Sequence, residues 1–247
     1  MSSKLLFACV RFLTRHGACV TVSDTIKDSL APGGDMAEII TVDPCDASRM
    51  EFVLEYTTRL ITTGKVVAFP TDTFYGLGAD PMNLAAVSEI FRIKGRTADR
   101  PLPLLVASLD QAAEFAFNPP RTFFRLAEKF WPGPLTMVVT ASRLIPLKVT
   151  ANTGKVGLRW PRAPLAVAII AAAGRPITGT SANLTQNAPC STAEQVQKQL
   201  GDELPLIVDG GPTQGQTAST VVDLLGERVR ILRPGGVPES ELKEFLD

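Results

Sequence analysis

The 247-residue sequence contains one histidine, His16, which lies in the part of the chain with the least regular pattern. A single histidine in this position argues against a histidine general base, a Ser-His-Asp triad and a histidine-ligated metal centre. The sequence therefore predicts no metal-ligating residues. Catalysis by such a chain would have to depend on charge, on positioning and on the reactivity of the substrates.

Cysteines and long apolar runs are also scarce. The four cysteines have no C-x-x-C spacing and lie far apart, at Cys9, Cys19, Cys45 and Cys190. This pattern indicates the reduced thiols of a cytoplasmic protein rather than a disulfide framework or a zinc site. No apolar run reaches the roughly 18–20 residues that a bilayer-spanning helix needs, so no membrane partner is expected.

The chain has no excess charge of either sign. Its 25 lysines and arginines balance 25 acidic residues, and aromatic residues make up 6% of the sequence. A neutral chain argues against binding a polyanion over the whole surface, although it is compatible with a local basic patch. The few aromatic side chains also leave little for stacking on nucleic-acid bases.

Residues 1–35 differ from the rest of the chain. They contain no acidic residue before Asp24, end in Pro32-Gly33-Gly34-Asp35, and carry four scattered cations, Lys4, Arg11, Arg15 and Lys27. Basic, acid-poor segments are typical of organelle transit peptides. The alternative, which we favour, is a translated upstream leader before a start at Met36, because Gly-Gly-Asp can translate a purine-rich ribosome-binding sequence.

From Met36 onward, helical and strand patterns alternate. Apolar spacing predicts helices over 47–63, 83–93, 121–130, 163–173, 193–200 and 239–246, and one that begins at Leu109 after the cap Ser108. Short β-branched runs predict strands over 65–69, 102–106, 135–140, 156–160, 177–180, 206–208, 220–224 and 229–232, the last two as a hairpin. The alternation indicates one α/β domain, residues 36–247, with a mixed β-sheet flanked by helices.

Two tripeptides carry the most specific chemistry. Lys94-Gly95-Arg96 ends one predicted helix, and Ser181-Ala182-Asn183 follows a predicted strand. A compact ammonium group, a planar guanidinium fork, a hydroxyl and an amide are the donors that a phosphate group needs. Taken alone, the cations are more typical of a solvated helix end, and Ser181 and Asn183 are more typical of an ordinary turn.

Two further segments are candidates for binding a ligand. The loop Thr71–Gly78 is rich in hydroxyls and has two glycines, so its backbone can approach a ligand closely, or it is an ordinary turn between a strand and a helix. It matches neither a P-loop nor a G-x-G-x-x-G fingerprint. Asp209-Gly210-Gly211 is interpreted as a tight turn rather than a metal site.

Arg159 and Arg233 occupy similar positions. Each stands at the end of an apolar strand and shortly before a proline, where a cation is costly without a partner. Each arginine is therefore expected either in a structural ion pair or on a ligand carboxylate or phosphate. Their similar placement suggests that the two share one cleft.

In order along the chain, these segments resemble the YrdC/Sua5 family of threonylcarbamoyl-adenylate synthases. The similarity covers about residues 50–238, nearly the whole folded part, which is typical of the short, single-domain form. The matching segments are 69–78, Lys94-Gly95-Arg96, 131–136, 156–159, 180–183, 219–223 and Leu232-Arg233-Pro234-Gly235.

The resemblance implies a twisted open α/β sheet with a concave basic cleft, and a reaction. L-threonine, bicarbonate (or CO₂) and ATP, with Mg²⁺, would give threonylcarbamoyl-AMP and pyrophosphate. A separate transferase would then use the product to modify adenosine 37 of tRNA. The alternatives are an RNA-binding module of the same fold, which would bind tRNA or double-stranded RNA, and a paralogue that acts on another carbamoyl-type substrate.

The resemblance also assigns residues. Lys94, Arg96, Ser181 and Asn183 would be catalytic and hold the ATP phosphates and the reacting carbamate, with Arg100 and Arg233 as further ATP contacts. The threonine-binding positions match Thr73, Arg159, Gly179 and Ser219. Two positions depart from the family pattern: Arg100 replaces a common asparagine, and Leu105 replaces a histidine that often contacts threonine.

Overall fold

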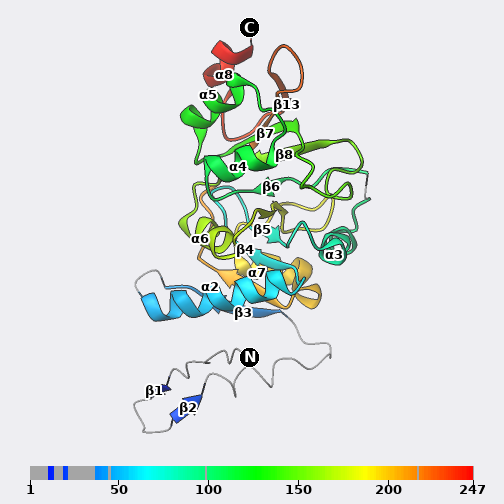
Figure 1. Ribbon diagram of the computed structural model, residues 1–247. Helices are drawn as coiled ribbons and strands as arrows, with labels where there is room; N and C mark the ends of the chain where they lie inside the picture. Colours follow the sequence, from blue (N-terminus) through cyan, green and yellow to red (C-terminus); the bar gives the residue numbers. More distant parts are fainter. Residues whose placement is uncertain are drawn as a thin grey trace, which may run out of the picture. The chain divides into compact units, whose positions relative to one another are not determined.

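The computed structural model describes residues 11–13, 19–21, 37–43, 46–97, 99–215 and 217–246 (Figure 1). The chain divides into two compact units, Met1–Asp35 and Met36–Asp247. In the first unit, β1 (Arg11–Leu13) and β2 (Cys19–Thr21) pair antiparallel. The remainder of residues 1–35, including His16, lies outside the described residues, so the leader interpretation stays a prediction.

The second unit contains two mixed sheets, where the sequence analysis predicted one. The first has the strand order β10-β5-β4-β11-β3. Strand β11 runs parallel to its neighbours β3 and β4, whereas β5 runs antiparallel to β4 and β10. The strands are β3 (Glu38–Thr41), β4 (Val67–Phe69), β5 (Gly76–Gly78), β10 (Thr180–Ser181) and β11 (Leu206–Asp209).

The second sheet has the order β13-β12-β7-β8-β6-β9. Two of its pairs are parallel, β12 with β7 and β6 with β8, and β12 and β13 form the predicted hairpin. Its strands are β6 (Leu104–Leu105), β7 (Leu135–Thr140), β8 (Lys155–Arg159), β9 (Ile177–Thr178), β12 (Thr220–Asp223) and β13 (Arg230–Arg233).

The single strand predicted over 177–180 is the place where the chain passes from one sheet to the other. Ile177 and Thr178 belong to the six-stranded sheet, Thr180 and Ser181 to the five-stranded sheet, and Gly179 lies between them. Apolar periodicity follows the burial of each residue, and both halves are buried. The sequence pattern therefore could not show that the strand changes its hydrogen-bonding partners.

The helices agree closely with their predicted positions (Figure 1). Asn83, Ser108 and Thr192 cap helix N-termini with their side chains. None of the described helices is long and apolar enough to cross a membrane. The helices are α2 (Ala47–Thr62), α3 (Leu84–Lys94), α4 (Leu109–Phe115), α5 (Arg121–Phe130), α6 (Pro164–Ala172), α7 (Ala193–Leu200) and α8 (Glu239–Leu246), with a short 3₁₀ turn η2 (Gly201–Glu203) after α7.

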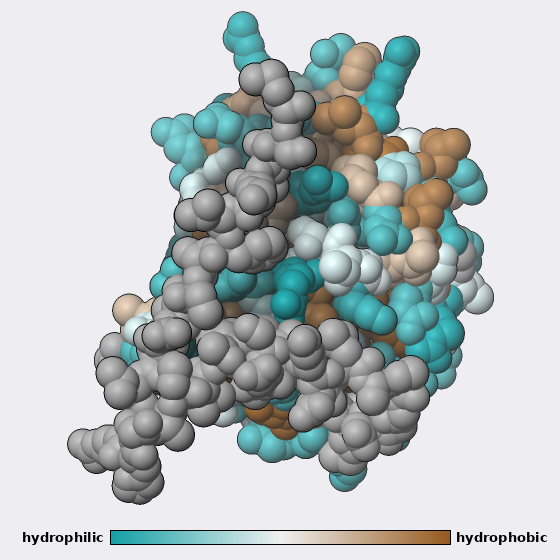
Figure 2. Space-filling model, turned by 60° about the horizontal axis from the view of Figure 1, so that its bottom comes forward, coloured by the Kyte–Doolittle hydropathy of each residue, from teal (hydrophilic) through white to brown (hydrophobic). Residues whose placement is uncertain are grey.

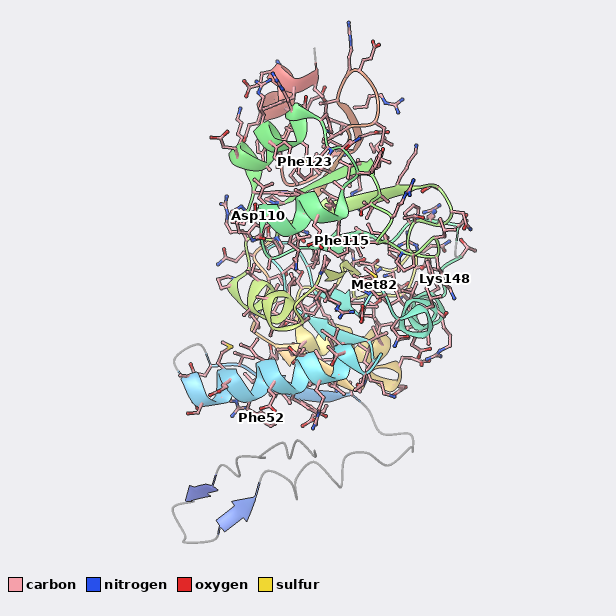
Figure 3. All side chains as sticks on the ribbon, in the orientation of Figure 1. Phe52, Met82, Asp110, Phe115, Phe123 and Lys148 are labelled. Carbon is pink, nitrogen blue, oxygen red and sulfur yellow. The ribbon has the colours of Figure 1, made fainter. Side chains whose placement is uncertain are left out.

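Two hydrophobic clusters form the core. The smaller one includes Val53 of α2, Phe69 of β4 and Ile169 of α6, and α2 packs on α6. The larger one includes Tyr75 and Phe123, and Phe123 also makes an edge-on contact with Trp131 at 5.6 Å between ring centroids. Figure 3 labels Phe123 on α5 and Phe52 on α2.

Large hydrophobic side chains on the surface are spread over many elements. They belong, for example, to α2, α3, α5 and β13. On the face drawn in Figure 2, hydrophobic and hydrophilic residues alternate over short distances. Such scattered exposure is ordinary for a globular domain and marks no interaction surface by itself.

The loop between β7 and β8 contacts both α3 and the segment that follows it. Lys148 of this loop donates a hydrogen bond from Nζ to Ser88 Oγ on α3 (Figure 3). The carbonyl of Val149 accepts a hydrogen bond at 2.9 Å from the amide of Leu102. The loop is thus hydrogen-bonded to the chain both before and after the first candidate tripeptide.

Candidate functional site

Lys94 lies at the last turn of α3, which ends in a left-handed cap at Gly95 (φ 56°). The amide of Gly95 bonds Arg92 O at 3.0 Å, and the amide of Arg96 bonds Phe91 O at 2.9 Å. This double hydrogen bond is the Schellman arrangement, which needs a residue that tolerates positive φ. The Lys94 side chain is buried, with 4% exposure, so the alternative of a solvated helix end is wrong for this residue.

The structure brings the two tripeptides together. Lys94 Nζ donates hydrogen bonds to Ser181 O at 2.5 Å and Asn183 O at 2.8 Å. The Lys94 carbonyl in turn accepts from the amide of Thr185 at 3.0 Å. Burial, together with the nearby charge of Arg96, lowers the pKa of Lys94 to about 8. A buried ammonium group with only neutral carbonyl partners is a ready site for an anion.

Asn183 presents an unused acceptor in the same place. Its Nδ2 donates to Leu184 O at 2.7 Å and to Asn187 O at 2.9 Å, and two carbonyl partners fix which end of the amide is nitrogen. Asn183 Oδ1 is buried and has no hydrogen-bond partner. Gln199 supports this loop by accepting from Leu184 N at 3.2 Å and donating to Ala188 O at 3.1 Å.

Arg96 is half-buried beside this cluster. Its Nη2 donates to Pro101 O at 3.1 Å, whereas Nε is buried without a partner. Burial, followed by the charge of Arg100, lowers the pKa of the Arg96 guanidinium. Arg100 itself is exposed. Unpaired guanidinium and amide atoms in one region are the donors and acceptors that a polar ligand would satisfy.

A second cluster centres on Arg159, which the structure places in a buried ion pair at the end of β8. Arg159 Nη2 donates to Asp72 Oδ1 at 2.6 Å, Nη1 to Thr73 Oγ1 at 3.0 Å, and Nε to Gly133 O at 3.1 Å. Burial lowers the pKa of Arg159, and Asp72 opposes this shift. An ion pair was one of the two predicted fates of Arg159, whereas no pattern in the sequence singled out Asp72 as its partner.

Arg233 reaches the same region from β13. Its Nη2 donates to Ser219 O at 2.8 Å and to Ser219 Oγ at 3.1 Å. Ser219 Oγ also lies 2.8 Å from Thr136 Oγ1. The charge of Arg233 contributes to lowering the pKa of Arg159, so the two guanidinium groups interact, as their similar placement in the sequence suggested.

The segment Thr71–Gly78 connects the two clusters. Thr73 contacts Arg159, and the backbone carbonyl of Tyr75 accepts from Ala182 N at 2.8 Å, within the Ser-Ala-Asn tripeptide. Strands β5 and β10 then pair Gly76 with Ser181. The hydroxyl-rich loop is therefore part of the candidate site rather than a simple turn between elements.

The turn at Asp209 is confirmed. Asp209 Oδ1 accepts from Gly211 N at 2.9 Å and from the Tyr75 hydroxyl at 3.1 Å. Within the part of the chain that the structure describes, no group of three histidine, cysteine or acidic residues is placed to hold a metal ion.

Gly179 packs closely on Leu105, the residue that stands where the family often has histidine. A Cβ atom at Gly179 would lie 2.4 Å from Leu105 Cγ, and Leu105 is 2% exposed. Leu105 therefore belongs to the hydrophobic core. Its close contact with residue 179 is possible only because glycine has no side chain. Any side chain at position 179 would clash with Leu105, so either Leu105 or the backbone next to the Ser-Ala-Asn tripeptide would have to shift.

Gly179→Ala is accordingly expected to lower the free energy of unfolding by about 1–3 kcal/mol, the usual effect of overpacking a core. Urea unfolding of the purified variant measures this. Gly226→Ala is the matched control, because the nearest atom to its new Cβ is Arg228 O at 3.7 Å. It is expected to change stability by less than about 0.5 kcal/mol. Equal stability of the two variants would contradict the proposed contact.

With this geometry, the sequence can be compared with known families. The sequence profile of the Sua5/YciO/YrdC family, described as Telomere recombination, matches residues 59–235. The chain belongs to the Sua5/YciO/YrdC family. The predicted family is thereby confirmed, and the matched region contains both tripeptides, Arg159 and Arg233.

Curated relatives from this family are similar over most of the chain. The threonylcarbamoyl-AMP synthase of Pyrococcus abyssi is 38% identical over 196 residues, which cover 79% of this chain and 58% of that protein. The putative threonylcarbamoyl-AMP synthase of Mycobacterium tuberculosis is 35% identical over 206 residues, which cover 83% of this chain and 94% of that protein. The chain thus spans little more than half of the first Sua5/YciO/YrdC relative and nearly all of the second.

Solved structures of the family share the fold. The P. abyssi Sua5 structure complexed with L-threonine matches with a TM-score of 0.79 at 36% identity, over 85% of this chain and 61% of that one. Escherichia coli YciO matches with a TM-score of 0.76 at 25% identity, over 85% of this chain and 100% of that one. The predicted mixed α/β architecture is therefore confirmed.

Proposed function

We propose that this chain is an L-threonylcarbamoyladenylate synthase, a nucleotidyltransferase that makes threonylcarbamoyl-AMP and pyrophosphate from L-threonine, bicarbonate or CO₂, and ATP. The observation that carries the proposal is the buried Lys94 ammonium group, held by the backbone of Ser181 and Asn183. Unpaired polar atoms of Arg96 and Asn183 accompany it. The names of the curated relatives support the same reaction.

In this proposal, the first cluster binds ATP. Lys94 and Arg96 supply positive charge to the phosphate oxygens, and Ser181 and Asn183 orient the reacting groups. Arg100 and Arg233 are further contacts to the nucleotide. Mg²⁺ enters with ATP as part of the substrate, since magnesium is commonly bound through substrate phosphates and few protein ligands.

The second cluster binds L-threonine. Arg159 offers its guanidinium to the carboxylate, because each terminal nitrogen has a second N–H beyond the one given to Asp72 or Thr73. Ser219 and Thr73 supply hydroxyls, and the backbone at Gly179 approaches the amino acid closely. Together with the first cluster, these residues form the proposed concave basic cleft.

The chemistry needs little covalent help from the protein. The neutral amine of threonine attacks CO₂, and loss of a proton leaves a carbamate. A carbamate oxygen then attacks the α-phosphorus of ATP, and pyrophosphate leaves with the bond electrons. Such phosphoryl transfer is accelerated chiefly by positioning and by cations on the phosphate oxygens.

We place the enzyme in the cytoplasm, where a separate tRNA threonylcarbamoyl transferase would consume its product. Direct binding of tRNA is a further proposal, and phosphate-dominated binding of that kind would weaken steeply with added salt.

A turnover assay with ATP, Mg²⁺, bicarbonate and L-threonine tests the function. Pyrophosphate release is expected to require both threonine and bicarbonate, and mass spectrometry should detect threonylcarbamoyl-AMP. Pyrophosphate release that is independent of threonine would point to a paralogue acting on another carbamoyl-type substrate. No release from the folded full-length chain would contradict the synthase and favour the RNA-binding alternative, tested by the salt dependence of tRNA binding.

A further inference from the structure

Asp72 has a buried oxygen to which none of the described residues donates a hydrogen bond. Its side chain is 13% exposed, and Oδ1 accepts the 2.6 Å hydrogen bond from Arg159. Asp72 Oδ2 is buried and has no hydrogen-bond partner. A carboxylate can accept about four hydrogen bonds, and a buried acceptor without a donor is unfavourable. The structure therefore leaves this buried acceptor of Asp72 without a donor among the described residues.

The neighbouring hydroxyl groups are already engaged with each other. Thr73 Oγ1 accepts from Arg159 and lies 3.1 Å from Thr71 Oγ1. Thr71 Oγ1 donates to Phe74 O at 2.7 Å. These bonds hold the loop and Arg159 in place, and none of them reaches Asp72 Oδ2.

The charges around Asp72 are arranged like the complement of an α-amino acid. Arg159 supplies positive charge for a carboxylate, and Asp72 supplies the one negative charge that, among the described residues, is bonded directly to Arg159. In an α-amino acid, the ammonium and carboxylate groups are separated by a single carbon. Receptors for the two groups must then lie next to each other, as Asp72 and Arg159 do.

We propose that Asp72 Oδ2 accepts the hydrogen bond of the substrate's α-amino group, so that Asp72 selects amino acids over other carboxylic acids. This inference rests on the proposed function, because it assumes that threonine binds beside Arg159. It adds to that function a contact residue and the group that the residue recognises.

A purely structural role for Asp72 makes a different prediction. If Asp72 only positioned Arg159, its loss would weaken every ligand whose carboxylate Arg159 binds. If Asp72 contacts the amino group, its loss would weaken only ligands that have one. A ligand without the amino group therefore distinguishes the two roles.

The test compares L-threonine with (R)-3-hydroxybutanoate, which keeps the carboxylate and the hydroxyl but lacks the amino group. Calorimetric titration of the full-length wild-type chain is expected to show at least a tenfold preference for threonine, as a charge-assisted hydrogen bond provides. Asp72→Asn keeps an oxygen for Arg159. It is expected to weaken threonine binding by tenfold to a hundredfold and to change (R)-3-hydroxybutanoate binding by less than threefold.

Asp80→Asn is the matched control. Asp80 is also a buried aspartate with an arginine partner, Arg175 at 3.2 Å, and is not one of the groups that surround Arg159. This variant is expected to bind both ligands as the wild type does. Circular dichroism of each variant reports whether it is folded.

The outcomes separate the inference from the proposed function. Equal weakening of both ligands by Asp72→Asn, or unchanged threonine binding, would overturn the inference alone. A wild-type chain that binds no threonine would overturn the proposed substrate and the inference together. If Asp72→Asn does not fold, NMR spectra of wild-type protein labelled with ¹³C-aspartate test the inference instead. Threonine is expected to shift the Asp72 carboxyl resonance, and (R)-3-hydroxybutanoate is not. A resonance that threonine does not shift would overturn the inference.

Discussion

Replacing Arg96 by alanine is expected to reduce kcat/KM for threonylcarbamoyl-AMP formation by about 10²- to 10⁴-fold, the range seen when a cation or donor that stabilises a phosphoryl or acyl transition state is removed. Arg96 has a buried Nε without a partner, and its only described side-chain hydrogen bonds go to the backbone carbonyls of Arg100 and Pro101. The guanidinium of Arg96 therefore contributes little to the free energy of unfolding. Pyrophosphate release measured with saturating threonine and bicarbonate tests the expectation, and the unfolding midpoint should change little.

Arg92 provides the matched control for Arg96. It lies in the last turn of α3, four residues before Arg96, and its side chain is 55% exposed. Its guanidinium pairs with Glu89 and Glu203, and exposed pairs of this kind contribute about 0–1 kcal/mol. Arg92→Ala should keep kcat/KM within about twofold of the wild type. A near-normal rate for Arg96→Ala, or equal losses in both variants, would contradict the role given to Arg96.

The contrast between Arg92 and Arg96 shows what the sequence could predict about the site. Helical periodicity and the glycine at position 95 predicted where α3 ends, and therefore which cations follow its last turn. The resemblance to the family implied that the second tripeptide would share a site with the first. Local rules suffice only for the end of α3, because caps and apolar spacing depend on residues that are close in the chain.

The sequence could not predict which polar atoms lack a partner. Asp72 and Asn183 each have one bonded and one unbonded side-chain terminal atom. For Asp72 the difference depends on a residue far away in the chain, because Asp72 meets Arg159 across 87 positions. The change of sheet at Gly179 has the same origin, since the hydrogen-bonding partners of a buried strand leave no local pattern.

Lys94→Met should produce the second large effect, a loss of ATP affinity together with a loss of its pH dependence. In the wild type, burial lowers the pKa of Lys94 to about 8, so the ammonium group of the free enzyme loses its charge as the pH rises above that value. If phosphate binding needs the charged form, the dissociation constant for ATP rises about tenfold per pH unit above pH 8. The variant is expected to bind ATP at least tenfold more weakly at pH 7.5, with no change up to pH 9.5.

The same pKa makes a prediction about stability. Unfolding returns Lys94 to its ordinary pKa of 10.5, so between pH 8 and 10.5 the unfolded chain binds more protons at this group than the folded chain. The contribution of Lys94 to the free energy of unfolding must then become more favourable to the folded state as the pH rises across this window. Below pH 8 both states are protonated, and the unfavourable burial of the charge is present in full, at about 3 kcal/mol.

Denaturant unfolding of the wild type and Lys94→Met at several pH values isolates this contribution, because other titrating groups cancel in the difference. The wild type should gain about 3 kcal/mol relative to the variant between pH 7.5 and 10.5. The variant also leaves the carbonyls of Ser181 and Asn183 without their donor, which costs about 1–3 kcal/mol at every pH and so shifts the difference without changing its slope. A difference that is flat with pH would mean that Lys94 is not held as a buried cation, and the proposed phosphate site would then lose its central charge.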